Sequence, residues 1–178
     1  KRWNELYKKE LYDSRIIPTK MISKVISELK TKPEFFINAS ATGIYGDRGD
    51  EILNEESSLG SDYLANLCKD WESEVLKANI HTRTITVRIG VVLDEKGGAL
   101  EKLILPFKFF AGGRLGSGNQ FLPWIHIEDL INSFLFIIEN HEVSGAVISS
   151  SPNPSRNKEF AKVLGKVLSR PSMLPAPG

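Results

Sequence analysis

The side chains best suited to chemistry stand at the ends of strand-like segments. Ser40 closes the apolar run 34–40, where its hydroxyl could hold an oxygen atom of a ligand. Ligands of parallel sheets bind beyond the carboxyl ends of the strands, so this position favours a binding role. Arg88 and His126 lie within apolar segments. For Arg88 we favour a structural ion pair. For His126 we favour a core imidazole ring that is hydrogen-bonded to a backbone group.

The charge balance and the cysteine content exclude several classes of partner. With 23 Lys and Arg against 22 Asp and Glu, the net charge of +1 gives no general attraction to nucleic acid or an anionic membrane. Cys68 is the only cysteine and lacks the Cys and His neighbours that a metal site requires. No apolar run approaches the roughly 20 residues of a membrane span. We therefore expect no metal, no nucleic acid, no membrane, and a cytoplasmic protein.

Hydrophobic periodicity predicts helices that alternate with strands. A helix over 15–30 carries an apolar stripe, with Pro18 expected in its first turn, and Asp129 is expected to cap the helix 130–140. The run 34–40 does not alternate, so we interpret it as a strand buried on both faces. The apolar stripe of the helix 15–30 consists of Ile17, Met21, Ile22, Val25, Ile26 and Leu29. The expected order is a weak helix 3–11, helix 15–30, strand 34–40, loop 42–61, helix 62–78, strand 81–93, helix 100–110, strand 123–127, helix 130–140, strand 145–151 and a last helix from Asn157.

This alternation predicts an α/β fold, a parallel sheet with flanking helices. Because too few neighbours exist to cover its strands, we expect the sheet to be an incomplete portion of a doubly wound fold. The segment 42–61 is long for a connection between packed elements, and such loops usually carry function or are disordered. On the helix 62–78, one face is expected to hold Leu64, Leu67, Cys68, Trp71 and Val75.

Several segments resemble the signature blocks of the epimerase-like atypical short-chain dehydrogenase/reductases. The matching segments are 2–15, 37–51, 87–100, 112–130 and 150–160. Members of that family carry, before these segments, a glycine-rich strand–turn–helix that holds the cofactor pyrophosphate. No such turn occurs here, so we expect 1–178 to be the C-terminal part of one NAD(P)-binding Rossmann-type domain, with substrate-side segments 94–123 and 152–178. We expect the natural protein to continue upstream with that unit and downstream with a short helical tail. By themselves, these residues should expose a sheet edge and the apolar face of helix 15–30.

The resemblance also implies a set of site residues. The catalytic candidates are Ser40 and Tyr63, and NADP or NAD, held mainly by the upstream unit, would contact Ala39, Ser40, Ala41, Val91 and Val92. The substrate-binding candidates are Thr42, Tyr45 and Arg114. Tyr45 could equally be a packed aromatic residue, and the two valines could serve only strand packing.

Two departures from the family pattern bear on function. The resemblance puts Leu64 and Cys68 where the catalytic Tyr and the Lys four residues later would stand, so ordinary Tyr–Lys chemistry is in doubt. More distantly similar nucleotide-sugar epimerases hold a diphosphate with an Arg where Leu122 stands, which disfavours a nucleotide-sugar substrate. We expect an NAD(P)-dependent oxidoreductase or epimerase-like protein acting on a small carbonyl or hydroxyl compound. The alternative is a non-catalytic NAD(P)-binding sensor, and a homodimer is left open in both cases.

Overall fold

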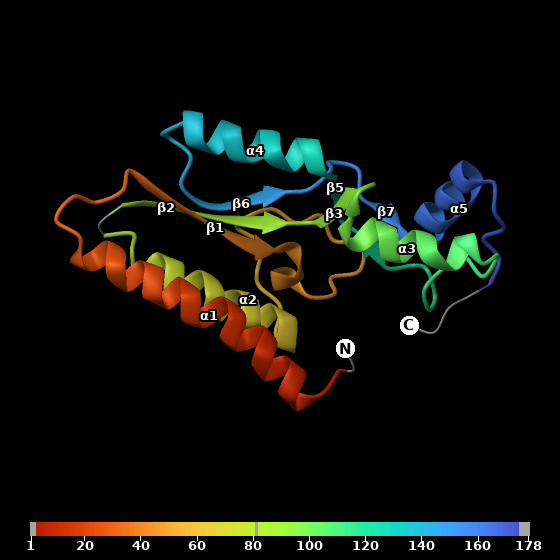
Figure 1. The fold of residues 1–178 in the computed structure, drawn as a ribbon, viewed down its shortest axis with the longest axis horizontal. Helices are drawn as coiled ribbons and strands as arrows, with labels where there is room; N and C mark the ends of the chain where they lie inside the picture. The colour runs from red at the N-terminus through yellow and green to blue at the C-terminus, as the bar shows by residue number, and fades with distance from the viewer. Residues whose placement is uncertain (1–2, 81, 175–178) are drawn as a thin grey trace. The chain divides into compact units, whose positions relative to one another are not determined.

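The computed structural model describes residues 3–80 and 82–174, which divide into two compact units. The first unit comprises Lys1–Arg88 and Phe136–Ile148, and the second comprises Ile89–Leu135 and Ser149–Gly178. In the first, strands β1 (Phe35–Ala41), β2 (Arg83–Ile89) and β6 (Gly145–Ser149) form a sheet in the order β1-β2-β6. Their arrows run in the same direction in Figure 1, and helices α1 (Glu5–Glu28) and α2 (Tyr63–Leu76) pack together beside them. The predicted α/β fold with a parallel sheet and flanking helices is confirmed.

Helix α1 buries polar residues and exposes its apolar stripe. Of the stripe only Ile26 is buried, at 5% exposed, whereas the other five side chains are 45–62% exposed. The side chains facing inward include Thr19, which accepts a hydrogen bond from Trp71 Nε1 at 2.8 Å, and Ser23, which donates to the Glu74 carbonyl at 2.7 Å. Small hydroxyl residues let the two helices approach closely, and each hydroxyl finds a partner. The expected exposure of this apolar face is confirmed.

The N-terminal region forms one helix, not two. Asn4 caps it, accepting a hydrogen bond from the Tyr7 amide at 2.8 Å, and the helix continues through Pro18. The predicted break between 3–11 and 15–30 is therefore wrong, as is the placement of Pro18 in a first turn. An interior proline removes one helical hydrogen bond, and packing of α1 on α2 outweighs that local cost.

Strand burial differs between the two long strands of the first unit. In β2, five consecutive residues from Thr84 to Arg88 are buried, as expected of a strand covered on both faces. In β1, only Ser40 is buried, and the other residues are half-buried. The expectation that 34–40 is buried on both faces is therefore wrong within the described residues, where β1 is less covered than β2.

The predicted strand 81–93 is two strands, because the chain leaves the first sheet at Gly90. There the Gly90 amide donates to the Ser149 carbonyl at 3.0 Å, and the next amide, of Val91, donates to the Pro123 carbonyl at 2.7 Å. A Cβ on Gly90 would lie 2.9 Å from that same carbonyl oxygen. The close approach of backbone requires glycine here and ends β2 at Ile89.

The second unit is built on short strands and three helices. Strand β3 (Val91–Asp94) pairs in parallel with β5 (Trp124–His126), and β4 (Phe121–Leu122) pairs antiparallel with β7 (Ser155–Arg156). The helices are α3 (Gly98–Lys108), α4 (Ile127–Glu139), which ends in the first unit, and α5 (Asn157–Leu168). In the described ranges, no helix combines the length and apolarity that crossing a bilayer requires.

The start of α4 corrects two expectations. The helix begins at Ile127, so Asp129 lies inside its first turn and is not its cap. His126 takes that role instead, because its Nδ1 accepts a hydrogen bond from the Glu128 amide at 3.3 Å. The ring is satisfied by a backbone group, as expected, but His126 is exposed and not a core residue.

Candidate functional site

Ser40 lies at the carboxyl end of β1 with an unsatisfied hydroxyl group. Its side chain is 4% exposed, and its Oγ has no hydrogen-bond partner among the described residues. Leaving a buried hydroxyl unpaired costs about 1–3 kcal/mol, and such groups in native structures often mark functional positions. The position and the unpaired oxygen together make Ser40 the centre of the candidate site.

Cys68 projects from α2 toward the same strand end. It is 6% exposed and packs with Ile44 and Tyr45 in a buried cluster that Ala41 also contacts. Burial raises the pKa of the Cys68 thiol above its usual value, and the charge of Glu72 raises it further. The thiol therefore stays protonated at neutral pH.

Directly after β1, the chain forms a short helical turn, η1 (Thr42–Tyr45), that is fixed by a buried ion pair. Arg88 donates through Nε and Nη2 to both carboxylate oxygens of Glu72, at 3.0 and 2.9 Å. Its Nη1 donates to the Tyr45 hydroxyl at 2.8 Å and to the Glu55 carbonyl at 3.0 Å. Arg88 and Glu72 are 5% and 8% exposed, so this is the structural ion pair that the sequence favoured.

The contact between Tyr45 and Arg88 does not replace a Tyr–Lys pair. Tyr45 is 2% exposed, and burial raises the pKa of its phenol more than the hydrogen bond and the charge of Arg88 lower it. The guanidinium is also neutralised by Glu72. A phenol with a raised pKa is a poor base near neutral pH, so this arrangement suits packing and not proton transfer.

The raised pKa of Tyr45 predicts a loss of stability in alkali. Its folded-state pKa lies above the unfolded value, so its contribution to stability is present below pH 10.0 and is lost as the pH rises through the folded pKa. Urea unfolding of the wild type and Tyr45→Phe at neutral and alkaline pH checks this. The stability deficit of the variant should shrink above about pH 10. A deficit that is constant or grows would contradict it.

The long loop after η1 is ordered by polar contacts. Glu55 fixes it to the sheet, because its carboxylate accepts a hydrogen bond from the Ile148 amide at 2.9 Å while its carbonyl binds Arg88. The two ends meet where the Gly60 amide donates to the Ile44 carbonyl at 2.9 Å. These contacts hold the loop in place through Glu55 and at its two ends.

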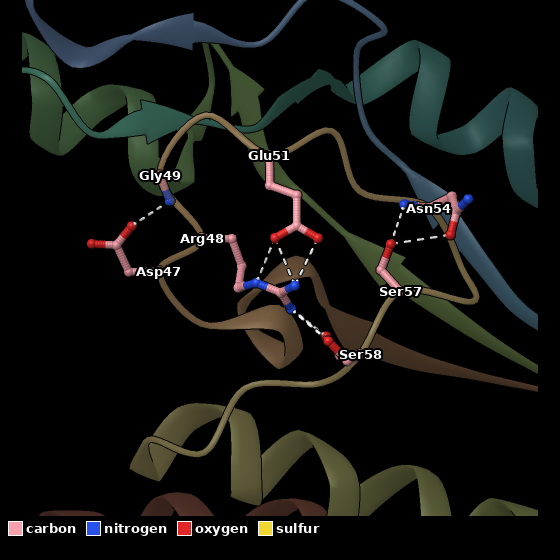
Figure 2. A network of polar contacts seen from close by, with 7 residues as sticks. All are labelled: Asp47, Arg48, Gly49, Glu51, Asn54, Ser57 and Ser58. Carbon is pink, nitrogen blue, oxygen red and sulfur yellow. Dashed lines mark hydrogen bonds and ion pairs between the residues drawn. The ribbon is translucent and has the colours of Figure 1, made fainter.

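Figure 2 shows the outer part of this loop, where one side chain connects its two halves. Arg48 forms an ion pair with Glu51, with Nη2 and Oε2 2.6 Å apart, and donates through Nη1 to the Ser58 carbonyl at 2.6 Å. The Asn54 amide donates to Ser57 Oγ at 2.9 Å, which closes a smaller turn. These contacts connect the two halves of the loop and hold it in one conformation.

The structure separates the two catalytic candidates by their contacts. The Tyr63 hydroxyl donates to the Lys8 carbonyl on α1 at 2.6 Å, whereas the hydroxyl of Ser40 is buried and unpaired. Leu64 is 48% exposed, so its expected place on the buried face of α2 is wrong. The catalytic role of Tyr63 stays a prediction, with its hydroxyl engaged on another element.

The remaining candidates of the first unit surround Ser40 in the chain. Ala39 and Ala41 are half-buried at the end of β1, and the Ala39 carbonyl accepts a hydrogen bond from Asn38 Nδ2 at 2.6 Å. Thr42 begins η1 and is half-buried. Their cofactor- and substrate-binding roles stay predictions, as does that of Tyr45.

The candidates of the second unit lie on β3 and on the loop before β4. Val91 and Val92 are half-buried and pair in register with Trp124 and Ile125. Arg114 is exposed, and its guanidinium forms no hydrogen bond or ion pair with another described residue. These roles also stay predictions.

The loop around Arg114 is held by the start of α5. Asn157, 5% exposed, accepts a hydrogen bond from the Leu115 amide at 2.7 Å, and Lys158 Nζ donates to Asn119 Oδ1 at 3.1 Å. A Cβ on Gly112 would lie 2.2 Å from the Phe107 ring. That glycine is required by close packing.

Sequence reasoning missed Glu72 and Glu55, although a signal for the first existed. Glu72 stands four residues after Cys68, on the otherwise apolar face of α2, and β2 contains one buried Arg. A buried carboxylate and a buried guanidinium on neighbouring elements are almost always paired. Glu55 had no such signal, because its partners Arg88 and Ile148 are distant in sequence and it lies in an irregular loop.

Comparison with known proteins identifies relatives along the whole chain, although no family model matches it. The Arabidopsis thaliana protein named epimerase family protein SDR39U1 homolog, chloroplastic, is 43% identical over 178 residues, which make up 99% of this chain and 51% of that protein. The crystal structure of human epimerase family protein SDR39U1 (isoform 2) with NADPH is 34% identical, with a TM-score of 0.91 over 99% of this chain and 60% of that one.

A third similar protein is the nucleoside-diphosphate sugar epimerase from Corynebacterium glutamicum. Its structure is 37% identical, with a TM-score of 0.81 over 99% of this chain and 39% of that one. The chain spans 51–58% of the length of the first curated relatives that it matches. Identity of this degree along the whole chain, together with the shared fold, confirms the resemblance. Along its whole length the chain is therefore similar to proteins named as epimerase family proteins, as its resemblance to the epimerase-like atypical short-chain dehydrogenase/reductases implied, and it shares the Rossmann-type α/β fold of the human structure.

Proposed function

We propose that this chain is part of an NAD(P)-dependent, epimerase-like oxidoreductase in which Ser40 holds an oxygen atom of a small carbonyl or hydroxyl compound. The observation that carries the proposal is the buried, unpaired Oγ of Ser40 at the carboxyl end of a sheet strand. Such a group suits an oxygen ligand, because binding would satisfy it in a dry environment where a hydrogen bond is strongest. The human relative solved with NADPH supports the choice of cofactor.

The residues around Ser40 fit a flat cofactor ring. The flanking Ala39 and Ala41 are half-buried and have small side chains, which suit the close approach of a ring to the strand end. When bound, NAD(P) supplies or accepts a hydride at its nicotinamide ring. The role of this chain is to bind and orient the substrate. The Ser40 hydroxyl donates a hydrogen bond to a substrate oxygen on which negative charge develops.

A non-catalytic NAD(P)-binding module is the second candidate. It is favoured by the residues that stand where the family has its Tyr and Lys. Leu64 is an exposed aliphatic residue, and Cys68 is a protonated thiol. Neither side chain can exchange a proton near neutral pH. A cytoplasmic location and a homodimer stay predictions in both cases.

NADPH and NADH should each be titrated into the full-length protein by calorimetry, followed by a screen of aldehydes and ketones for NADPH oxidation. We expect saturable binding of one dinucleotide per chain. Binding with turnover supports the oxidoreductase, and binding without turnover supports the sensor. If neither dinucleotide binds, both candidate functions are overturned.

Ser40→Ala should make the protein more stable and less active. Removing an unpaired buried hydroxyl should raise the free energy of unfolding by about 1 kcal/mol, while the chemical step slows. The matched control is Ser23→Ala, which should lower stability because its buried hydroxyl is bonded to the Glu74 carbonyl. Urea unfolding and NADPH oxidation measure the two effects. Loss of stability in Ser40→Ala would show that the hydroxyl is satisfied and refute its assignment to a ligand.

A further inference from the structure

Three basic side chains gather in the second unit, where the loop before β4 meets the start of α5. Arg114 and Lys158 approach each other at Gly118, which is buried and has a φ of 71°. A Cβ on Gly118 would lie 2.9 Å from Arg114 Cδ and 2.9 Å from Lys158 Cβ, so both side-chain stems pass close to this glycine. The third member is Arg156, whose Nη1 donates to the Asn119 carbonyl at 2.6 Å. We call Arg114, Arg156 and Lys158 the basic cluster.

Little negative charge balances the basic cluster. Arg114 and Lys158 are exposed, and neither forms an ion pair with a carboxylate of the described residues. Lys158 Nζ donates to Asn119 Oδ1 at 3.1 Å, which is a neutral acceptor. Glu159 follows in the chain, and one of its carboxylate oxygens accepts a hydrogen bond from the Arg156 backbone amide at 3.1 Å. Because holding like charges together costs free energy, the arrangement favours a ligand that neutralises them.

The backbone that carries the cluster is fixed by hydrogen bonds between the loop and α5. The Lys158 amide donates to the Gly118 carbonyl and the Asn157 amide to the Gln120 carbonyl, both at 2.9 Å. The Asn157 side chain, 5% exposed, accepts from the Leu115 amide at 2.7 Å. These bonds occupy the first two amides of α5, so the side chains of the cluster, and not the helix terminus, are the donors for a ligand.

A phosphate group matches this set of donors in charge and in shape. A phosphate monoester carries about two negative charges near neutral pH and three acceptor oxygens. A guanidinium donates to two such oxygens at once, and an ammonium acts as a compact charge. A carboxylate has one charge and two oxygens, so it would leave most of the positive charge of the cluster unbalanced.

We propose that the basic cluster binds a phosphate group of a small ligand. Arg114 and Lys158 donate to the phosphate oxygens, and Arg156 adds positive charge beside them. This site goes beyond the proposed function, because it requires neither Ser40 nor catalysis.

Inorganic phosphate is the probe, and its binding to the full-length protein is measured by phosphorus NMR titration. Arg114→Gln should weaken binding about tenfold and Lys158→Gln about three- to tenfold, because each removes a charge-assisted hydrogen bond. Lys158→Arg, which keeps the charge, should bind within about twofold of the wild type. The matched control is Lys162→Gln, which removes an exposed charge one helical turn further along α5 and should also stay within about twofold.

Three results would overturn the proposal. They are no binding by the wild type, unchanged affinity in Arg114→Gln and Lys158→Gln, and an equal loss in Lys162→Gln, which would indicate general attraction by surface charge. Malonate, a dicarboxylate, should displace phosphate only at higher concentration, and displacement at equal or lower concentration would refute the choice of phosphate. Displacement of the probe by NADPH would assign the phosphate group to the cofactor, and retention would assign it to another ligand. The loss in the two variants is read without NADPH, so it stands even if the proposed function fails.

Discussion

Arg88→Met should lower the free energy of unfolding by about 3–5 kcal/mol, because it leaves the Glu72 carboxylate buried without a counter-charge. Glu72 is 8% exposed, and Arg88 satisfies both of its carboxylate oxygens. The substitution also removes the donor that Tyr45 and the Glu55 carbonyl share, so the turn after β1 and the following loop lose their common anchor. Urea denaturation monitored by tryptophan fluorescence measures the loss.

Two variants show whether charge burial is the cause. The double variant Arg88→Met with Glu72→Met should be more stable than Arg88→Met alone, because an apolar pair of similar size removes the unpaired charge. Arg48→Met is the control, in a more exposed ion pair whose arginine side chain is 24% exposed. Its partner Glu51 is 49% exposed, so we expect a cost of less than about 1 kcal/mol. A double variant less stable than Arg88→Met, or equal costs at positions 48 and 88, would contradict the explanation.

Gly60→Ala should lower the free energy of unfolding by about 1–3 kcal/mol, since a methyl group there has no room. A Cβ on Gly60 would lie 2.8 Å from the Gly46 amide nitrogen and 2.8 Å from the Tyr45 carbonyl oxygen. Both are backbone atoms that cannot rotate away. The ends of the loop would separate, and the hydrogen bond from the Gly60 amide to the Ile44 carbonyl would be lost.

Gly43→Ala serves as the control, because a Cβ there has no neighbour within 4 Å among the described residues. We expect it to change stability by no more than about 0.5 kcal/mol. Limited proteolysis should also show cleavage of the loop 46–60 in Gly60→Ala but not in the control. If both alanine variants are equally stable, the two ends of the loop do not meet as described.

The sequence by itself determined the fold class and the place of Ser40. The alternation of helical and strand periodicities is a local property. It predicted β1, α2, α3, β5, α4, β6 and α5 in their order, but it joined β2 and β3 into one strand and missed the two-residue strands β4 and β7. The blocks that resemble the family identified it, and they placed Ser40 at a strand end. These features need no knowledge of which segments touch.

The errors of the sequence analysis have a common physical origin in tertiary contacts. Pro18 lies inside α1 because packing on α2 outweighs one lost hydrogen bond, and the strand breaks at Gly90 because the Pro123 carbonyl approaches too closely for a side chain. His126 replaces Asp129 as the cap of α4 since the helix starts where β5 ends. Local propensity is weak, and contacts from distant segments override it.

Only the tertiary structure decided how the site is built. Arg88 is 43 residues from Tyr45 and 33 from Glu55, and neither pairing can be derived from spacing along the chain. The sequence named Ser40 but could not show that its hydroxyl is buried and unpaired. Burial and pairing depend on which segments meet in space, and that is fixed by the packing of the whole unit and not by any local pattern.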